Sequence, residues 1–201
     1  MHHWLSLDTV IELMLGISLS AACGFRVFVP LLVMSVAAVL GHVPLPADFD
    51  WVNSSQALWL FAIASVVEVG GYYVPWVDHM LEIVALPLAI AAGTLVTAAV
   101  APEQLNPLVQ WTLALVVGGG AAGLTRGMNW FVRIISTALS AGLTNPIFAT
   151  IELAIALGLA VLALTVPVFA GVLVLSVWLL AANKIRRFLA QRQQSAQPPT
   201  A

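Results

Sequence analysis

The chain has 201 residues, of which 61% are hydrophobic and only 8% are charged, and its formal net charge is −2. A soluble domain carries roughly 25% charged residues, so this composition excludes a soluble protein and indicates one membrane domain. Because a membrane span needs about 20 apolar residues, the chain has room for about six spans with short loops. The small net charge excludes a nucleic-acid-binding protein, and the single Cys23 excludes an internal disulfide or a cysteine-rich metal site.

The first helix is predicted over residues 10–22. Thr9 and Glu12 form a capping box directly ahead of this apolar run, which is a typical helix start. Residues 23–26, with the sequence CGFR, interrupt the pattern. A second helix is expected over residues 27–40.

The acidic loop 42–56 precedes a predicted span over residues 57–74. A proline-containing turn follows, in which Asp78 is expected to be the N-cap of the next helix and Glu82 to lie in its first turn. Both carboxylates favour a helix N-terminus, so a capping role is predicted for them. The span that they introduce is predicted over residues 81–100.

A further span is predicted over residues 108–125, followed by an amphipathic segment over residues 126–141. Arg126, Asn129 and Arg133 recur at three- and four-residue steps, so they share one helix face. Two interpretations stay open. The arginines either meet lipid headgroups from a cytoplasmic interfacial helix, or form a cationic strip that faces an anionic substrate inside the bundle.

Asn145 and Pro146 give a strong helix start, with Asn145 as N-cap and Pro146 as the first helical residue. Two more spans are predicted over residues 147–165 and 168–183. Residues 185–201 are polar and are expected to form a disordered tail.

The basic residues predict the orientation in the membrane. Four of the seven lie near the C-terminus, which should therefore be cytoplasmic. A consistent assignment has six crossing segments: 27–41, 57–74, 81–100, 108–125, 147–165 and 168–183. Segments 10–25 and 127–143 then dip in from the cytoplasmic side as re-entrant or interfacial helices, and both termini are expected in the cytoplasm.

The chain carries a possible internal repeat. Residues 19–21 and 139–141 both read Leu-Ser-Ala, and each is followed at the same spacing by a phenylalanine, Phe28 or Phe148. In both copies a helix ends, a non-helical break follows and a new helix begins, in the same predicted orientation. Interrupted hydrophobic segments at corresponding places in two halves indicate a transport site.

Glu68 and Glu152 each interrupt an apolar span. A carboxylate at bilayer depth costs a few kcal/mol and needs a partner, a proton or a water-filled cavity. The two glutamates either couple protons or contact substrate, or form structural ion pairs with arginine. Arg26, in the first break, either anchors a helix end or pairs with one of them.

Residues 118–123 spell G-x-G-x-x-G, but no strand–turn–helix unit surrounds them, so dinucleotide binding is excluded. Gly119, Gly123 and Gly127 instead predict a close helix-packing face. The sequence contains no nucleophile–base set and no metal-ligand spacing. We therefore expect no catalytic residue, metal or cofactor, and do not expect an enzyme.

Three phrases carry a resemblance to a known family: GISLSAACGFRVFVPLLVMSVAAVLG, VPWVDHMLE after the Glu68 span, and STALSAGLTNPIFATIELAIALGLAVLAL. Together they resemble the bacterial, cyanobacterial and plastid membrane family catalogued as domain of unknown function 4126, over nearly the whole chain. The resemblance implies an integral protein of a bacterial inner membrane or a thylakoid membrane, and supplies no activity. The helix–break–helix hairpins are also similar in architecture to membrane proteins of the DedA type, which move phospholipids or lipid carriers.

We predict an all-α polytopic bundle of about six spans plus two broken or re-entrant segments, forming one domain over residues 1–184. The expected function is transport or lipid translocation of an anionic, phosphate-bearing substrate, with proton coupling at Glu68 and Glu152. The alternative is a structural or assembly subunit of a larger membrane complex. Expected partners are membrane lipids, the anionic substrate, and a second copy or a membrane-complex subunit. The predicted substrate-binding residues are Arg26, Arg126, Asn129, Arg133 and Asn145.

Overall fold

The computed structural model describes residues 7–43, 45–102, 105–140 and 145–195, with the side chains of residues 75, 135–140, 145, 185 and 188–195 left out. Within these residues the chain is helical and contains no strand, which confirms the predicted all-α class. The elements are α1 (Leu7–Phe25), α2 (Phe28–Val39), η1 (Ala47–Asn53), α3 (Ser55–Gly71), α4 (Pro75–Ala99), α5 (Pro107–Leu113), η2 (Ala114–Gly119), α6 (Gly120–Ser140), α7 (Asn145–Thr165) and α8 (Pro167–Ser195).

Five helical segments are long and apolar enough to cross a membrane: Leu7–Phe25, Trp76–Ala99, Pro107–Ile134, Pro146–Thr165 and Pro167–Lys184. The pair η1 and α3, bent by 60°, makes a sixth if it is counted as one span. The expected polytopic bundle is therefore confirmed.

The division into spans differs from the prediction at two places near the start of the chain. Segment 10–25 was expected to dip, yet α1 has 19 residues and the length and composition of a span. Residues 27–41 were expected to cross, yet α2 has only 12 residues. At about 1.5 Å per residue, α2 reaches about 18 Å, which is short for a hydrocarbon layer of about 30 Å.

The predicted boundary between residues 125 and 126 is absent. α5, η2 and α6 follow one another without a break from Pro107 to Ser140, and η2 is a π-helical turn within this run. A change from uniformly apolar to amphipathic sequence does not stop a helix unless a residue such as proline breaks the backbone. α8 likewise continues to Ser195, through most of the tail that was expected to be disordered, because Lys, Arg, Gln, Leu and Ala there are good helix formers.

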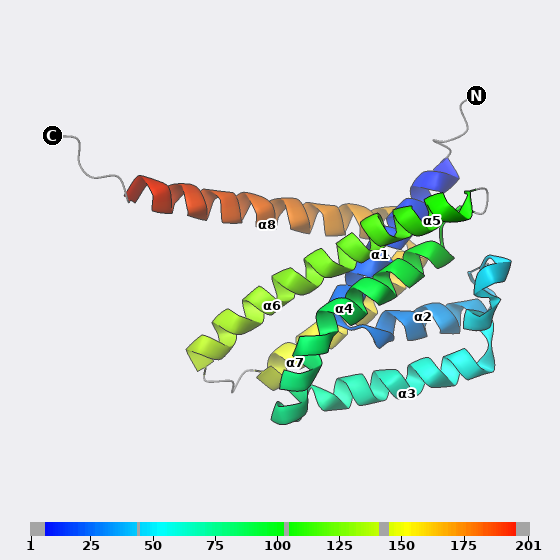
Figure 1. The fold of residues 1–201 in the computed structure, drawn as a ribbon, viewed down its shortest axis with the longest axis horizontal. Helices are drawn as coiled ribbons and strands as arrows, with labels where there is room; N and C mark the ends of the chain where they lie inside the picture. The colour runs from blue at the N-terminus through cyan, green and yellow to red at the C-terminus, as the bar shows by residue number, and fades with distance from the viewer. Residues whose placement is uncertain (1–6, 44, 103–104, 141–144, 196–201) are drawn as a thin grey trace.

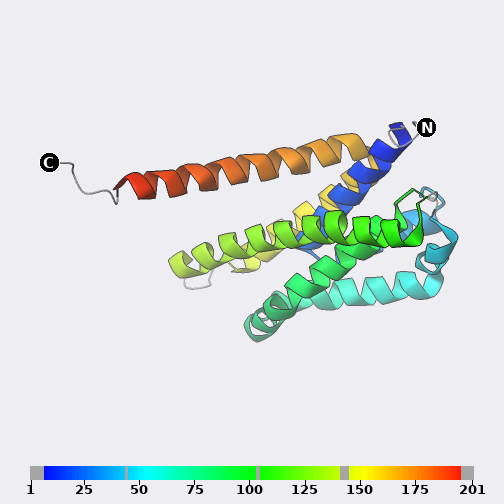
Figure 2. The same cartoon turned by 45° about the horizontal axis from the view of Figure 1, so that its top comes forward.

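If Pro107–Ser140 is counted as one helix, the successive α-helices run in alternating directions (Figures 1 and 2). One end of the bundle holds the start of α1, η1 and the α7–α8 turn, and we call it the η1 end. The opposite end holds the α1–α2 break at Arg26, the α3–α4 turn and the end of α6, and we call it the Arg26 end. α8 also ends on that side, so α1 starts and α8 ends at opposite ends. α1 and α6 run in one direction, and α2 and α7 run in the opposite direction. The two helix pairs of the predicted repeat, α1–α2 and α6–α7, therefore have the same orientation.

Glycines allow α4 and the π-helical turn to approach closely. A Cβ on Gly93 would lie 2.6 Å from the Ala122 Cβ and 2.7 Å from the Gly118 carbonyl oxygen. Two of the three predicted glycines pack against α4: a Cβ on Gly119 would lie 2.7 Å from Thr94 Oγ1, and one on Gly123 would lie 3.2 Å from Ile90 Cγ1. A Cβ on Gly127 would meet nothing within 4 Å, so the predicted face does not extend that far. Gly118 adds a closer contact that was not predicted, against Thr97 and the Gly93 carbonyl oxygen.

Gly93→Ala is expected to destabilise the protein by about 1–3 kcal/mol, because the added methyl group overpacks a contact made by backbone atoms. Gly120→Ala is the matched control, since a Cβ there meets nothing within 4 Å and alanine favours a helix over glycine. Thermal unfolding in detergent should show a lower midpoint for Gly93→Ala and an equal or higher one for Gly120→Ala. Equal midpoints for wild type and Gly93→Ala would contradict the close contact.

Candidate functional site

Arg26 lies in the break between α1 and α2 and is 1% exposed. Its Nη2 donates to the Ala149 carbonyl oxygen at 2.8 Å and lies 3.1 Å from Oε2 of Glu152, both on α7. Its guanidinium carbon lies 3.7 Å from the centroid of the Tyr72 ring, which is within the range of a cation–π contact. Its Nε and Nη1 are buried and make no hydrogen bond to any described residue. Arg26 therefore joins the α1–α2 break to α7 and to the end of α3.

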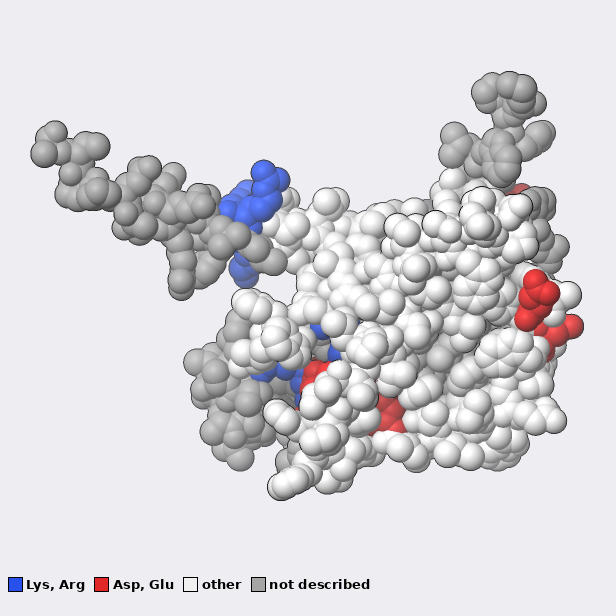
Figure 3. Space-filling model, in the orientation of Figure 1, with Lys and Arg blue, Asp and Glu red and all other residues white. Residues whose placement is uncertain are grey.

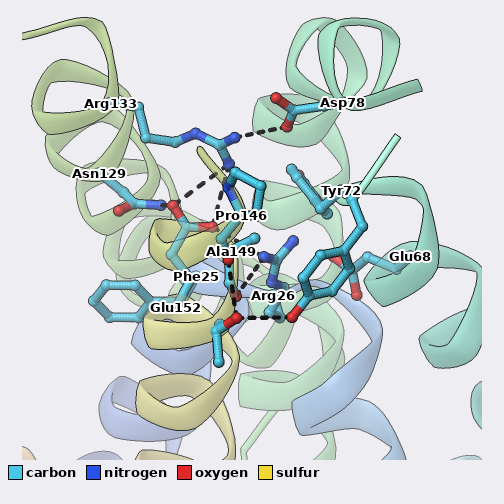
Figure 4. Close-up of polar contacts among 12 residues, drawn as sticks. Phe25, Arg26, Glu68, Tyr72, Asp78, Asn129, Arg133, Pro146, Ala149 and Glu152 are labelled. Carbon is cyan, nitrogen blue, oxygen red and sulfur yellow. Dashed lines mark hydrogen bonds and ion pairs between the residues drawn. The ribbon is translucent and has the colours of Figure 1, made fainter. Parts of the chain in front are cut away.

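Glu152 is the centre of the cluster and is 2% exposed. Besides Arg26, it accepts a hydrogen bond from Asn129 Nδ2 at 2.9 Å and lies 3.3 Å from Arg133 Nη1. One carboxylate of α7 thus contacts side chains from the α1–α2 break and from α6 (Figure 4). Of the two partners considered for Arg26, the structure pairs it with Glu152.

The two arginines of α6 face inward. Arg126 is 2% exposed and Arg133 is 6% exposed, whereas Trp130 and Phe131 on the other face are exposed. The cationic strip therefore faces the bundle and does not meet lipid headgroups. The inward orientation is the one that the second interpretation of segment 126–141 predicted, while the anionic substrate that this interpretation includes stays a prediction.

Two carboxylates of α4 pair with these arginines. Arg133 Nη2 donates to Asp78 Oδ1 at 2.6 Å, and Arg133 Nη1 lies 2.9 Å from Glu82 Oε1. Arg126 Nη2 lies 3.0 Å from Glu82 Oε2 and donates to the Tyr72 hydroxyl at 2.9 Å. The Glu82 contacts are ion pairs at short distance, without the geometry of hydrogen bonds.

The predicted capping role of Asp78 is wrong. α4 begins at Pro75 after Val74, which is the N-cap and offers no side-chain cap, so Asp78 already lies inside the helix. Proline at the first helical position starts the helix earlier than the sequence rule for aspartate suggested. Asp78 and Glu82 are one helical turn apart, and this spacing, in a chain with three arginines in apolar surroundings, was the available signal for a paired site.

Glu68 serves a different element. It is 5% exposed, and its two oxygens accept hydrogen bonds from the backbone amides of Val27 at 2.7 Å and Phe28 at 2.9 Å. These are the first amides of α2, whose own N-cap residue, Val27, supplies no side-chain cap. Glu68 of α3 thus caps α2 from a neighbouring helix. Among the described residues its close partners are these amides, and no ion pair within 4.0 Å joins it to an arginine.

Asn145 is the first residue of α7, where a helix start was predicted, but its side chain lies outside the described part of the chain. The predicted residues Arg26, Asn129, Arg133 and Glu152 come together in one contiguous set with Arg126 beside them.

Tyr72 was not predicted from the sequence as part of this site. Its ring lies within 6 Å of all three guanidinium carbons, at 3.7, 5.9 and 5.2 Å. Nothing local in the sequence marks it.

The charged cluster is reachable from the Arg26 end. Figure 3 shows blue and red atoms inside a hollow between the helices at that end, and the Glu82 side chain is 16% exposed. Two cavities adjoin the cluster: one of about 460 Å³ between α1, α6, α7 and α8, bordered by Asn129, and one of about 260 Å³ between α2, α3 and α4, bordered by Glu68 and Tyr72. Among the described residues no group of three His, Cys, Asp or Glu is arranged to hold a metal ion.

The family described as a domain of unknown function (DUF4126) matches residues 13–187, so the chain belongs to this family. None of the curated proteins and none of the solved structures compared with the chain gives a significant match.

Proposed function

We propose that this member of the DUF4126 family is a transporter or lipid translocase for an anionic, phosphate-bearing substrate. One observation carries the proposal: three inward-facing guanidinium groups gather around Tyr72 and Glu152, next to a hollow at one end of a membrane bundle. A guanidinium presents a planar fork of donors that matches phosphate oxygens, and charged side chains inside membrane spans are costly unless they have a function or a partner.

The carboxylates give the arginines a way to exchange partners. Glu82 is the most exposed of the ion-paired side chains in the cluster and contacts both Arg126 and Arg133 through ion pairs that lack hydrogen-bond geometry. A phosphate group entering from the Arg26 end meets this carboxylate first and competes with it for the two arginines. A displaced or newly unpaired carboxylate, Glu82 or Glu152, then takes up a proton, which couples substrate movement to proton movement. Asn129 and the N-terminus of α7 at Asn145 supply further donors.

The positive-inside rule orients the bundle with the basic end of α8 in the cytoplasm of a bacterial inner membrane, or on the equivalent side of a thylakoid membrane. The arginine cluster then lies nearer the cytoplasmic face, and the exposed Asp48 and Asp50 of η1 lie nearer the opposite face. The start of α1 shares the η1 end, so this orientation revises the expectation of two cytoplasmic termini. We assign no enzymatic activity and no nucleic-acid partner.

The test uses the purified protein in phosphatidylcholine vesicles with two probes. One is fluorescent phosphatidylglycerol, whose movement between leaflets is read by chemical quenching from outside. The other is entrapped inorganic phosphate, whose release is measured. Wild type should move at least one probe faster than protein-free vesicles, and Arg133→Lys should slow it about tenfold or more, because lysine keeps the charge but loses the fork. Neither probe moving faster than in protein-free vesicles would overturn the proposal.

A second candidate, a structural or assembly subunit of a membrane complex, is favoured by the completeness of the pairing. Each of the three arginines in the cluster contacts at least one carboxylate within 3.1 Å, which is what a static network of ion pairs requires. Under this alternative, mild solubilisation of native membranes releases the protein in one complex with a partner at fixed stoichiometry. Release as a lone chain or a simple homo-oligomer counts against it.

A further inference from the structure

The cavity between α1, α6, α7 and α8 is an apolar groove. It holds about 460 Å³ and is lined by α1, α6, α7 and α8, with Phe25, Met128, Leu162 and Trp178 among its walls. All four helices belong to segments with the length and composition of membrane spans. A concave surface of this kind within the bilayer is filled by hydrocarbon and not by water, because apolar walls offer water no hydrogen bonds.

Two polar side chains, Thr125 and Asn129, lie at one side of this groove, one turn apart on α6. The Thr125 hydroxyl is buried and makes no hydrogen bond with a described residue. Thr94, Thr112 and Thr150 instead donate to the carbonyl oxygen four residues earlier, as helical threonines commonly do. A buried hydroxyl without a partner costs free energy, so it marks a place where a ligand's acceptor is favoured.

Asn129 connects the groove to the charged cluster. Its amide lines the groove and donates to Glu152, which contacts Arg26 and Arg133. In Figure 4, Phe25 and Asn129 lie on one side of Glu152, and Arg26 and Tyr72 lie on the other. An apolar volume, a polar border and a cationic cluster therefore follow one another across the bundle. This order matches the acyl chain, ester region and phosphate of a phospholipid.

We propose that the groove binds an acyl chain of an anionic phospholipid, with Thr125 and Asn129 contacting its ester region and its phosphate directed to the arginine cluster. This inference rests on the proposed function and narrows its substrate to a lipid. The inference adds Thr125 as a substrate-contacting residue. It assigns Asn129, already a predicted substrate-binding residue, a contact with the ester region. The occupant comes from the surrounding bilayer.

Gly158 offers a way to block the groove without disturbing the fold. It lines the cavity, and a Cβ there would meet nothing within 4 Å, so Gly158→Leu projects a side chain into the groove. Gly120→Leu is the matched control: it is also an exposed helical glycine with open space at Cβ, and it does not line the groove. Both changes replace glycine by a strong helix former, so neither should impair folding.

Retention of phosphatidylglycerol is measured by native mass spectrometry on purified wild type and variants, with thermal midpoints as the folding readout. Gly158→Leu should weaken retention about tenfold, Thr125→Val about fivefold, and Gly120→Leu should equal wild type. Phosphatidylcholine should be retained less well than phosphatidylglycerol. Equal retention by wild type and a folded Gly158→Leu overturns the inference.

The vesicle assay separates this inference from the proposed function. If entrapped phosphate crosses in an Arg133-dependent way while phosphatidylglycerol is neither retained nor moved, the lipid inference fails and transport of an anion stands. If neither probe moves, both fail. If phosphatidylglycerol moves in wild type and Gly120→Leu but not in Gly158→Leu, both are supported.

Discussion

Replacing Glu152 with glutamine is expected to lower the free energy of unfolding by about 3–5 kcal/mol, because removing one partner of a buried ion pair leaves an uncompensated charge. Arg26, at 1% exposure, has Glu152 as its only ion-pair partner among the described residues. Arg133 keeps Asp78 and Glu82. Glutamine preserves the volume and can still accept the hydrogen bond from Asn129, so the change isolates the charge. Unfolding of wild type and variant in matched detergent, by heat or denaturant, measures the difference.

Asp50→Asn is the control for Glu152→Gln, because Asp50 is exposed in η1 and its neutralisation should change the stability by well under 1 kcal/mol. A Glu152→Gln protein as stable as wild type would mean that Arg26 is satisfied by Ala149 and Tyr72 alone. A double variant, Arg26→Met with Glu152→Gln, tests the cause directly. It should recover part of the lost stability, because the charge that Glu152 compensated is gone.

Local sequence signals predicted the helices and the first break well, because they depend on neighbours in the chain. Proline, glycine and apolar run length predicted the α1–α2 interruption close to its observed place at Arg26 and the start of α7 at Asn145. The same signals did not predict which segments are long enough to cross the membrane: α1 is, and α2, with 12 residues, is short for a span. The re-entrant assignment of residues 10–25 and 127–143 followed from the distribution of basic residues. The absence of a strong helix breaker inside residues 10–25 and at residue 126 mattered more.

The pairing of charges could be anticipated only in part. The free-energy cost of a charged side chain at bilayer depth predicted that Glu152 and Arg26 need partners, and the two form an ion pair with each other. It could not assign Glu68, whose partners lie 41 and 40 residues away and are backbone amides without a side-chain signal. Asp78 was misassigned because a local capping rule competes with a tertiary contact to Arg133, 55 residues later, that only the packed helices reveal.

Glu68 is expected to control the start of α2, because a helix N-terminus leaves backbone amides without partners and favours negative charge. Val27 and Phe28 donate to Glu68, and Pro30 in the same turn has no amide hydrogen to donate. Glu68→Leu should remove both hydrogen bonds, each contributing roughly 1.5–3 kcal/mol because the acceptor is charged. Glu68→Gln keeps one acceptor oxygen for one of these two backbone amides but places its own NH₂ group against the other. The free energy of unfolding is therefore expected to fall by about 1–3 kcal/mol.

Hydrogen exchange gives the local readout for Glu68, because the amides of Val27 and Phe28 should lose protection in Glu68→Gln while those in the middle of α7 keep it. Ser54→Ala is the comparison for an ordinary cap. Ser54 caps its own helix, α3, by accepting from the Ala57 amide at 3.1 Å, so its loss should cost about 1 kcal/mol and leave α2 unchanged. If the variants of Glu68 transport normally yet lose α2 protection, its role is structural. Lost transport with intact protection of the α2 amides would instead assign Glu68 a proton-coupling role. Glu68 and Glu152 would then both be candidates for proton coupling.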